Sequence, residues 1–129
     1  MEEIVAQLAD YGLSKNEAKV LTFLAKRGAE KASIVARALK LNRTETYRTL
    51  RNLQRRGLIE ASLEQPVRFQ AASFSRCLET LIAERKNRIA ALEQRSGFLE
   101  RVFESLSVET AAPAFERFQV LEGRTRIGQ

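Results

Sequence analysis

Residues 42–71 of the sequence read NRTETYRTLRNLQRRGLIEASLEQPVRFQA. Asn42 and Glu45 have the spacing of a helix capping box, and Gly57 supplies a stop, so a helix is predicted over residues 43–56. Short runs rich in β-forming residues follow at 58–64 and 67–71, on either side of Gln65-Pro66, and these predict a hairpin of two strands. The segment therefore combines one strongly basic helix with a hairpin that comes directly after it.

The residues before this segment predict three more helices. A second capping box, Ser14 to Glu17, begins a helix that ends at Gly28, and a shorter helix is expected over residues 32–39, although Lys31 is a poor cap for it. A first helix is expected over residues 3–11. The apolar side chains expected to face inward in these three helices are Ile4, Val5, Leu8, Ala18, Leu21, Leu24, Ala25, Ile34, Val35, Ala38 and Leu39. Only a tight turn separates residues 32–39 from the basic helix, which is the pattern of a helix-turn-helix, and the added hairpin makes it a winged helix.

Positive charge is concentrated in this part of the chain. The whole chain of 129 residues has a net charge of +6, whereas residues 31–56 hold eight basic residues against one acid, Glu45. A focused basic segment favours a polyanion as partner. A solvated surface helix normally intersperses both signs of charge, so a merely soluble face is the weaker interpretation.

The helical period assigns roles to the side chains of residues 43–56. Tyr47, Leu50 and Leu53 are expected to form the buried stripe, with the Tyr47 hydroxyl at the surface, and the basic side chains lie on the opposite face. An α-helix fits the major groove of B-DNA, where arginine binds guanine edges and phosphates. Arg68 is expected on the second wing strand, beside an adjacent phosphate or the minor groove. The residues predicted to contact DNA are Arg43, Thr44, Tyr47, Arg48, Arg51, Arg55, Arg56 and Arg68.

A long helix is predicted over residues 74–106, because Gly97 is the only helix breaker there. One set of nine positions keeps a strict 4,3 spacing, and seven of them are large and apolar, which is a heptad seam and favours pairing of two helices. The predicted dimerisation residues are Leu78, Ile82, Arg85, Ile89, Leu92, Leu99, Phe103 and Leu106, with Ser96 also in the seam. Parallel and antiparallel pairing both remain open. The alternative is that the helix packs on its own winged domain.

Composition excludes much chemistry. With no His and a single Cys77, the chain offers no catalytic triad, no histidine-bearing metal site and no internal disulfide, so no catalytic residue, metal site or cofactor is predicted. Cys77 is expected to be a small, partly buried side chain. No segment has the apolar length of a membrane span or a signal peptide, so a cytoplasmic, nucleoid-associated protein without a membrane partner is expected.

The order of these motifs resembles the TrmB-like family of archaeal winged-helix transcription regulators. The resemblance rests on Tyr11–Val20 (YGLSKNEAKV), Ala32-Ser33, Arg43-Thr44 with Tyr47 and Leu50, Arg56–Ile59, Pro66 and Arg68-Phe69. It implies a dimeric DNA-binding regulator and carries over Arg43, Thr44, Tyr47, Arg48 and Arg51 as DNA contacts. Lys31, Lys40 and Asn42 stand where the family commonly has a hydroxyl cap, a glycine and a proline.

Three domains are expected from the sequence. Residues 1–73 form a winged helix-turn-helix, residues 74–106 a coiled-coil-like dimerisation helix, and residues 107–129 a linker around Thr110–Pro113 followed by one possible strand, Phe115–Gly123. Residues 118–124 resemble the start of the C-terminal effector domain through which full members of the family bind sugars. The given sequence does not extend through that domain, as expected either for the front part of a longer protein or for a short member of the family, so the resemblance carries over no small-molecule ligand.

The resulting fold class is mainly α with a small β-hairpin wing, and no enzyme activity is expected. The predicted function is a homodimeric, sequence-specific regulator that binds double-stranded DNA. A low-specificity architectural DNA-binding protein is one alternative. A protein-interaction module of the transcription machinery is another, which would need an exposed apolar patch such as Phe69.

Overall fold

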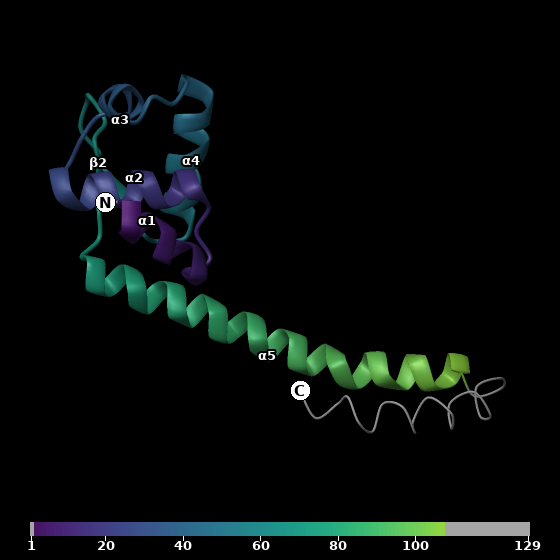
Figure 1. Ribbon diagram of the computed structural model, residues 1–129. Coiled ribbons are helices and arrows are strands. Elements are labelled where there is room, and N and C mark those ends of the chain that lie inside the picture. Colours follow the sequence, from purple (N-terminus) through teal and green to yellow (C-terminus); the bar gives the residue numbers. More distant parts are fainter. Residues whose placement is uncertain (1, 108–129) are drawn as a thin grey trace. The chain divides into compact units, whose positions relative to one another are not determined.

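A computed structural model describes residues 2–107 of the chain. The elements are α1 (Glu2–Leu8), a 3-10 turn η1 (Ala9–Tyr11), α2 (Lys15–Arg27), α3 (Ala32–Leu39), α4 (Arg43–Arg55), β1 (Ile59–Ala61), β2 (Phe69–Ala71) and α5 (Phe74–Ser107) (Figure 1). The chain divides into two compact units, Met1–Asn87 and a second that begins at Arg88. The predicted fold class, a mainly helical winged helix with a two-stranded wing and a long C-terminal helix, is confirmed. The linker and strand expected over residues 110–123 lie outside the described residues.

The starts of α2 and α4 are fixed by side-chain caps. At α2 the capping box is complete, because the Glu17 amide donates to Ser14 Oγ at 3.1 Å and the Ser14 amide donates to Glu17 Oε1 at 2.9 Å. At α4 only half of the predicted box forms: the Glu45 amide donates to Asn42 Oδ1 at 2.7 Å, but the Glu45 carboxylate accepts a hydrogen bond from Asn16 Nδ2 at 2.6 Å instead of reaching back. The side chain of Lys31 does not cap α3, as expected.

The core of the first unit lies where α2 packs against α1, α4 and β2. Leu21 and Leu24 of α2 and Leu50 and Leu53 of α4 are fully buried there. Burial of this apolar surface supplies the main driving force for folding. Three predictions of inward-facing residues were wrong, since the structure leaves Ile4, Ala25 and Ala38 exposed.

The wing is shorter than the sequence predicted. Antiparallel pairing joins Ile59 to Ala71 and Ala61 to Phe69, and the intervening residues form a loop. Phe69 also exchanges backbone hydrogen bonds with Glu30, at 2.8 and 3.0 Å, which ties the wing to the segment before α3. Phe69 is buried, so it does not supply the exposed apolar patch that the protein-interaction alternative required.

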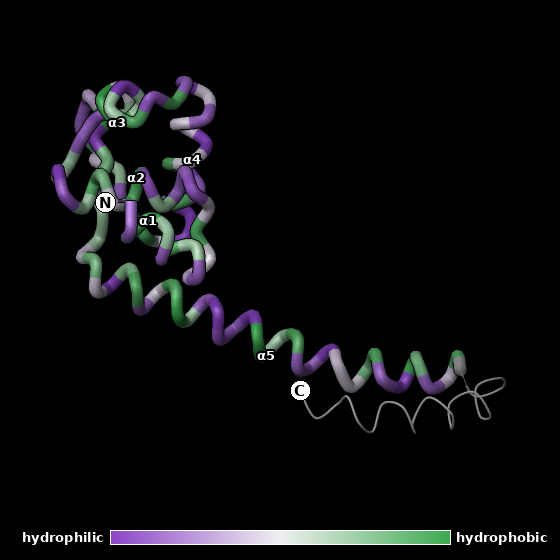
Figure 2. Tube along the Cα trace, viewed as in Figure 1, coloured by the Kyte–Doolittle hydropathy of each residue, from purple (hydrophilic) through white to green (hydrophobic). Residues whose placement is uncertain are grey.

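The first turns of α5 belong to the core of the first unit. Cys77 and Leu81 are buried, and Phe74 and Leu78 pack against the same cluster. Burial raises the pKa of the Cys77 thiol. In the second unit, hydrophobic residues recur along α5 between hydrophilic ones (Figure 2), and their side chains are exposed.

Candidate nucleic-acid interface

The exposed face of α4 is a shallow basic groove. It has a volume of about 470 Å³ and is lined by Arg43, Thr44, Tyr47, Arg48, Arg51, Asn52 and Arg55. We call this surface the α4 face. Helical spacing brings these side chains together, because residues three and four apart lie on the same side of a helix. Six of the eight residues predicted to contact DNA therefore share one surface.

A second groove, of about 500 Å³, lies between α3 and α4. Arg43 and Tyr47 line it together with Ser33 and Arg37, so it continues the α4 face. The Arg43 guanidinium carbon lies 5.9 Å from the centre of the Tyr47 ring, a cation–π arrangement that holds the two side chains near one another. Within the described residues, neither groove is lined by an acidic side chain. The two grooves together form a concave, positively charged surface.

Two residues of this surface correct the sequence analysis. Tyr47 was expected in the buried stripe, but it is 39% exposed, and Thr46 and Thr49 are buried in its place. The Thr46 hydroxyl is satisfied by donating to the Asn42 carbonyl at 2.8 Å, which is why a polar residue is tolerated there. Asn52 was missed, although it follows Arg48 by four residues and hydrogen-bonds the Arg55 guanidinium.

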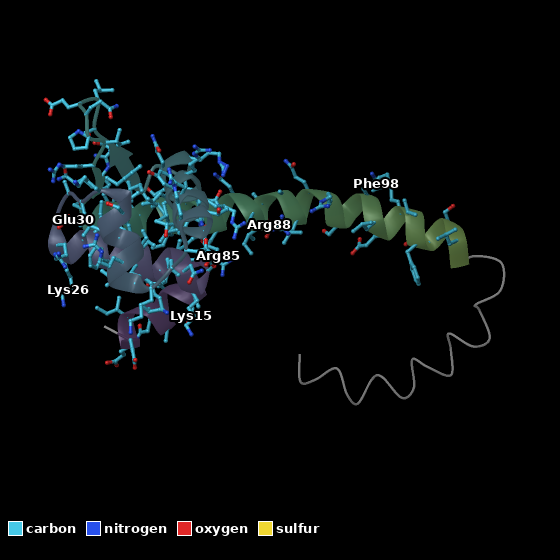
Figure 3. All side chains as sticks on the ribbon, turned by 90° about the horizontal axis from the view of Figure 1, so that it is seen from above. Lys15, Lys26, Glu30, Arg85, Arg88 and Phe98 are labelled. Carbon is cyan, nitrogen blue, oxygen red and sulfur yellow. The ribbon has the colours of Figure 1, made fainter. Side chains whose placement is uncertain are left out.

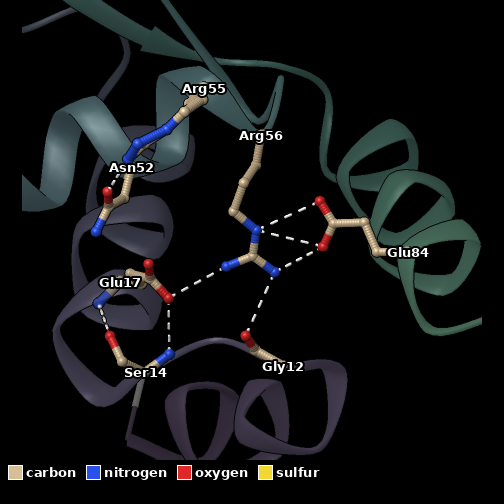
Figure 4. A network of polar contacts seen from close by, with 7 residues as sticks. All are labelled: Gly12, Ser14, Glu17, Asn52, Arg55, Arg56 and Glu84. Carbon is tan, nitrogen blue, oxygen red and sulfur yellow. Dashed lines mark hydrogen bonds and ion pairs between the residues drawn. The ribbon is translucent and has the colours of Figure 1, made fainter. Parts of the chain in front are cut away.

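Arg56 does not lie on the α4 face, and its predicted contact with DNA is corrected. It follows the last residue of α4, and its guanidinium turns inward (Figure 4). Nη2 donates to Glu84 Oε1 at 2.7 Å and to the Gly12 carbonyl at 3.3 Å, and Nη1 donates to Glu17 Oε1 at 3.3 Å. The hydrogen bond with Glu84 raises the pKa of Arg56. Its side chain is 25% exposed and is paired with two carboxylates of its own chain.

Arg68 lies in the loop of the wing, one residue before β2, rather than on the predicted strand. Its side chain is exposed. The loop is held by Ser62, whose amide donates to the Arg68 carbonyl at 2.8 Å and whose hydroxyl accepts from the Arg68 amide at 2.9 Å. The position of Arg68 is thus fixed by backbone hydrogen bonds while its guanidinium stays free to bind an anion.

The predicted dimerisation residues separate into two groups. Leu78 packs against the core, and Arg85 donates to the Asp10 carbonyl at 2.8 Å, so both make contacts within their own chain. To this extent the alternative, that the helix packs on its own domain, holds for its first turns. The remaining six side chains are exposed: Ile82, Ile89, Leu92, Leu99, Phe103 and Leu106. Phe98 and Val102 are exposed as well, and Figure 3 shows Phe98 standing out from α5.

Two other kinds of feature are absent from the described residues. No cluster of three or more potential metal ligands occurs among residues 2–107. In the same part of the chain, no helix combines the length and the hydrophobicity that crossing a bilayer requires.

A helix-turn-helix with a wing and an arginine-lined second helix defines a DNA-binding winged-helix protein. The family model described as "Sugar-specific transcriptional regulator TrmB" matches residues 8–75, which is more than half of the sequence. The chain belongs to the TrmB family. Comparison with curated proteins gives no match.

The same fold occurs in solved structures of other proteins. TrmBL2, an archaeal chromatin protein with a novel mode of DNA binding, matches 88% of this chain with a TM-score of 0.72 and 19% identity, and the match spans 45% of TrmBL2. A possible transcriptional regulator from Methanosarcina mazei matches 74% of this chain and 85% of its own, with a TM-score of 0.58 and 12% identity. A MarR family protein from Bacillus stearothermophilus matches 81% and 80%, with a TM-score of 0.50 and 19% identity. At these identities the likeness establishes the fold.

Proposed function

We propose that this chain is a homodimeric regulator that recognises specific double-stranded DNA sequences through the α4 face. The observation that carries the proposal is the concave surface with four arginines, Arg43, Arg48, Arg51 and Arg55, and no acidic lining residue within the described part of the chain. A surface of this kind attracts the phosphate backbone, and its helix has the width that the major groove accepts. The TrmB family membership supports the same class of partner.

The side chains of the α4 face are proposed to make two kinds of contact with DNA. Arg43, Thr44 and Arg48 lie in the first half of the helix, which in a helix-turn-helix points into the groove, and these are proposed to contact base edges. Arg51 and Arg55 lie further along and are proposed to bind phosphates, which sets the register of the protein on the duplex. Tyr47 offers a hydroxyl to a phosphate from the edge of the same surface. Arg68 of the wing is proposed to bind the adjacent backbone or the minor groove.

The proposed dimer contact is the exposed apolar row on α5. Ile89, Leu92, Leu99, Phe103 and Leu106 occupy a row with 4,3 spacing in which position 96 is serine, and Phe103 is 68% exposed. Large apolar side chains repeated at this spacing are normally covered by a second helix. A second copy of the chain would present the same row, and two copies related by a two-fold axis would read a palindromic site.

Fluorescence anisotropy with a labelled DNA duplex tests DNA binding and its mode. Affinity should fall steeply with salt, and Arg51→Gln should weaken binding to every sequence and reduce the slope of log K against log salt by about 0.9, the value for one phosphate contact. Arg48→Gln should also lower the preference for a selected site, by roughly 1–3 kcal/mol for a bidentate base contact. Arg76→Gln, an exposed arginine of α5, serves as the matched control and should change neither quantity.

The outcomes of this titration separate the candidate functions. Equal affinity for selected and random duplexes at moderate salt would favour the architectural alternative, in which the arginines bind phosphates alone. If charge reversal at Arg48 and Arg51 left the affinity for duplex DNA intact, the α4 face would not be the interface. Absence of duplex binding at low salt would overturn the proposed function.

Sedimentation equilibrium tests the proposed dimer. Phe103→Glu places a charge in the apolar row and should shift the protein from dimer to monomer. Arg101→Glu changes charge on the same helix outside the row and should leave the dimer intact. A wild-type protein that remains a monomer at micromolar concentration would refute the assignment of the row to self-association.

A further inference from the structure

Both ends of α4 are held by neighbouring residues of α2. At the start of α4, the Glu45 carboxylate accepts a hydrogen bond from Asn16 Nδ2 at 2.6 Å. Just past its end, Arg56 binds the Glu17 carboxylate at 3.3 Å. Asn16 and Glu17 are consecutive, so a single turn of α2 contacts the helix that carries the α4 face at both of its ends.

The contact at the end of α4 extends to α5. The Arg56 guanidinium, which lies between Glu17 and Glu84 in Figure 4, also donates to the Gly12 carbonyl. Arg85, the next residue of α5, donates to the Asp10 carbonyl at 2.8 Å. Three elements, namely α2, the Gly12 turn and α5, therefore meet at the side chain that ends α4. All of these residues lie within the first unit.

These polar contacts supply something that the apolar core does not. Packing of Leu50 and Leu53 is non-directional, so it resists separation of α4 from α2 more than it resists small rotations or shifts along the interface. A guanidinium donates in a fixed planar geometry, and charge-assisted hydrogen bonds are stronger and more directional than neutral ones. Arg56 thus adds directional contacts at the end of α4 to the apolar packing.

We infer that Arg56 is a positioning residue for DNA recognition and that Glu84 of α5 acts through it. On this view the first turns of α5 set the orientation of the α4 face, although neither residue touches DNA. The inference rests on the proposed function, because an orientation matters only if the α4 face enters the groove. It also assigns a role to Arg56, which was predicted to contact DNA but whose guanidinium points inward.

The substitution Glu84→Gln is a test because electrostatics and positioning predict opposite changes in DNA affinity. Removing a negative charge and releasing Arg56 makes the protein more positive, so electrostatics alone would leave DNA binding unchanged or tighten it. Loss of positioning instead weakens binding to a selected duplex, by roughly 3- to 10-fold, the range expected for breaking one coupled polar contact. Glu79→Gln removes the same charge from an exposed position of α5 and is the matched control.

Arg56→Gln and the double variant complete the test. Arg56→Gln should weaken binding by a similar factor without changing the salt slope, whereas loss of a phosphate contact would reduce that slope by about 0.9. The double variant Arg56→Gln/Glu84→Gln should bind no more weakly than Arg56→Gln, because Glu84 acts through Arg56. Thermal unfolding of each variant shows whether it is folded, and titration with excess DNA gives the fraction of protein that is able to bind. Together they show that weaker DNA binding is not a loss of folded protein.

The possible results are distinguishable from failure of the proposed function. If wild-type protein does not bind duplex DNA, the proposed function fails. If wild-type protein binds and Glu84→Gln binds equally well or more tightly, the positioning role is overturned while the α4 face stands. A reduced salt slope for Arg56→Gln would return Arg56 to the DNA interface.

Discussion

Replacing Lys40 with glycine is expected to stabilise the protein. Lys40 ends α3 in the left-handed conformation, with φ 58° and ψ 45°, and within the described residues it is the one non-glycine residue with positive φ. A side chain with a β-carbon pays about 1–2 kcal/mol in this region. Glycine avoids that strain but loses about 0.5–1 kcal/mol through the greater freedom of its unfolded chain. The free energy of unfolding should therefore rise by about 0.5–1 kcal/mol for Lys40→Gly.

Urea and thermal unfolding, followed by circular dichroism, measure this difference. A gain of that size raises the midpoint temperature of a small domain by roughly 2–8 °C. Lys40→Ala is the matched control, since it removes the same charge and side chain but keeps the β-carbon, so it should lack the gain. If Lys40→Gly were no more stable than Lys40→Ala, the strain assigned to the turn between α3 and α4 would be refuted.

Three further predictions test the packing. Leu81→Ala should lower the unfolding free energy by about 2–5 kcal/mol, because Leu81 is fully buried. Ile82→Ala, at a side chain that is 44% exposed, should lower it much less. Chemical denaturation of both variants shows whether α5 belongs to the core of the first unit. Thr22→Val should raise the unfolding free energy by about 1 kcal/mol in the same assay, since the buried Thr22 hydroxyl has no hydrogen-bond partner among residues 2–107. Burial raises the pKa of Cys77, so stability should be fully retained below the ordinary thiol pKa of 9.0 and decline as pH rises above it; a decline that persists unchanged in Cys77→Ala would contradict this cause.

Local patterns in the sequence predicted most of the fold. The capping box at Ser14, the bounds of α3 and the length of α5 depend on contacts three or four residues apart, which are visible in the sequence. The strands came out shorter than predicted because only three residues on each side pair, and the loop around Gln65-Pro66 takes the rest. Leu63, at the exposed tip of that loop, has an apolar side chain that a strand pattern alone assigns to the sheet.

The composition of the α4 face was predicted better than its edges. The exposed row of Thr44, Arg48, Arg51 and Arg55 follows from helical spacing and the absence of acids. The buried stripe of α4 includes Thr46 and Thr49 and leaves Tyr47 partly exposed. A pattern of apolar residues alone does not include threonine, so it places Tyr47 in the stripe instead. Successive residues of a helix differ by about 100° in direction, so Arg56 points to a different side from Arg55. The number of basic residues in the segment does not show that Arg55 and Arg56 point in different directions.

The first turn of α2 shows why local prediction stops short of the site. The Ser14–Glu17 box was predicted from its spacing, and the structure contains it. The same Glu17 oxygen that accepts from the Ser14 amide also binds Arg56, 39 residues away along the chain. A cap is specified by neighbours in the sequence, whereas this second contact exists only once α2, α4 and α5 have packed together. A capping residue is replaceable by others of its kind, but a carboxylate that both caps α2 and holds Arg56 is not, since glutamine would keep the cap and lose the ion pair. Glu17 is therefore needed both for the cap that begins α2 and for the ion pair with Arg56, on which the inferred orientation of the α4 face depends.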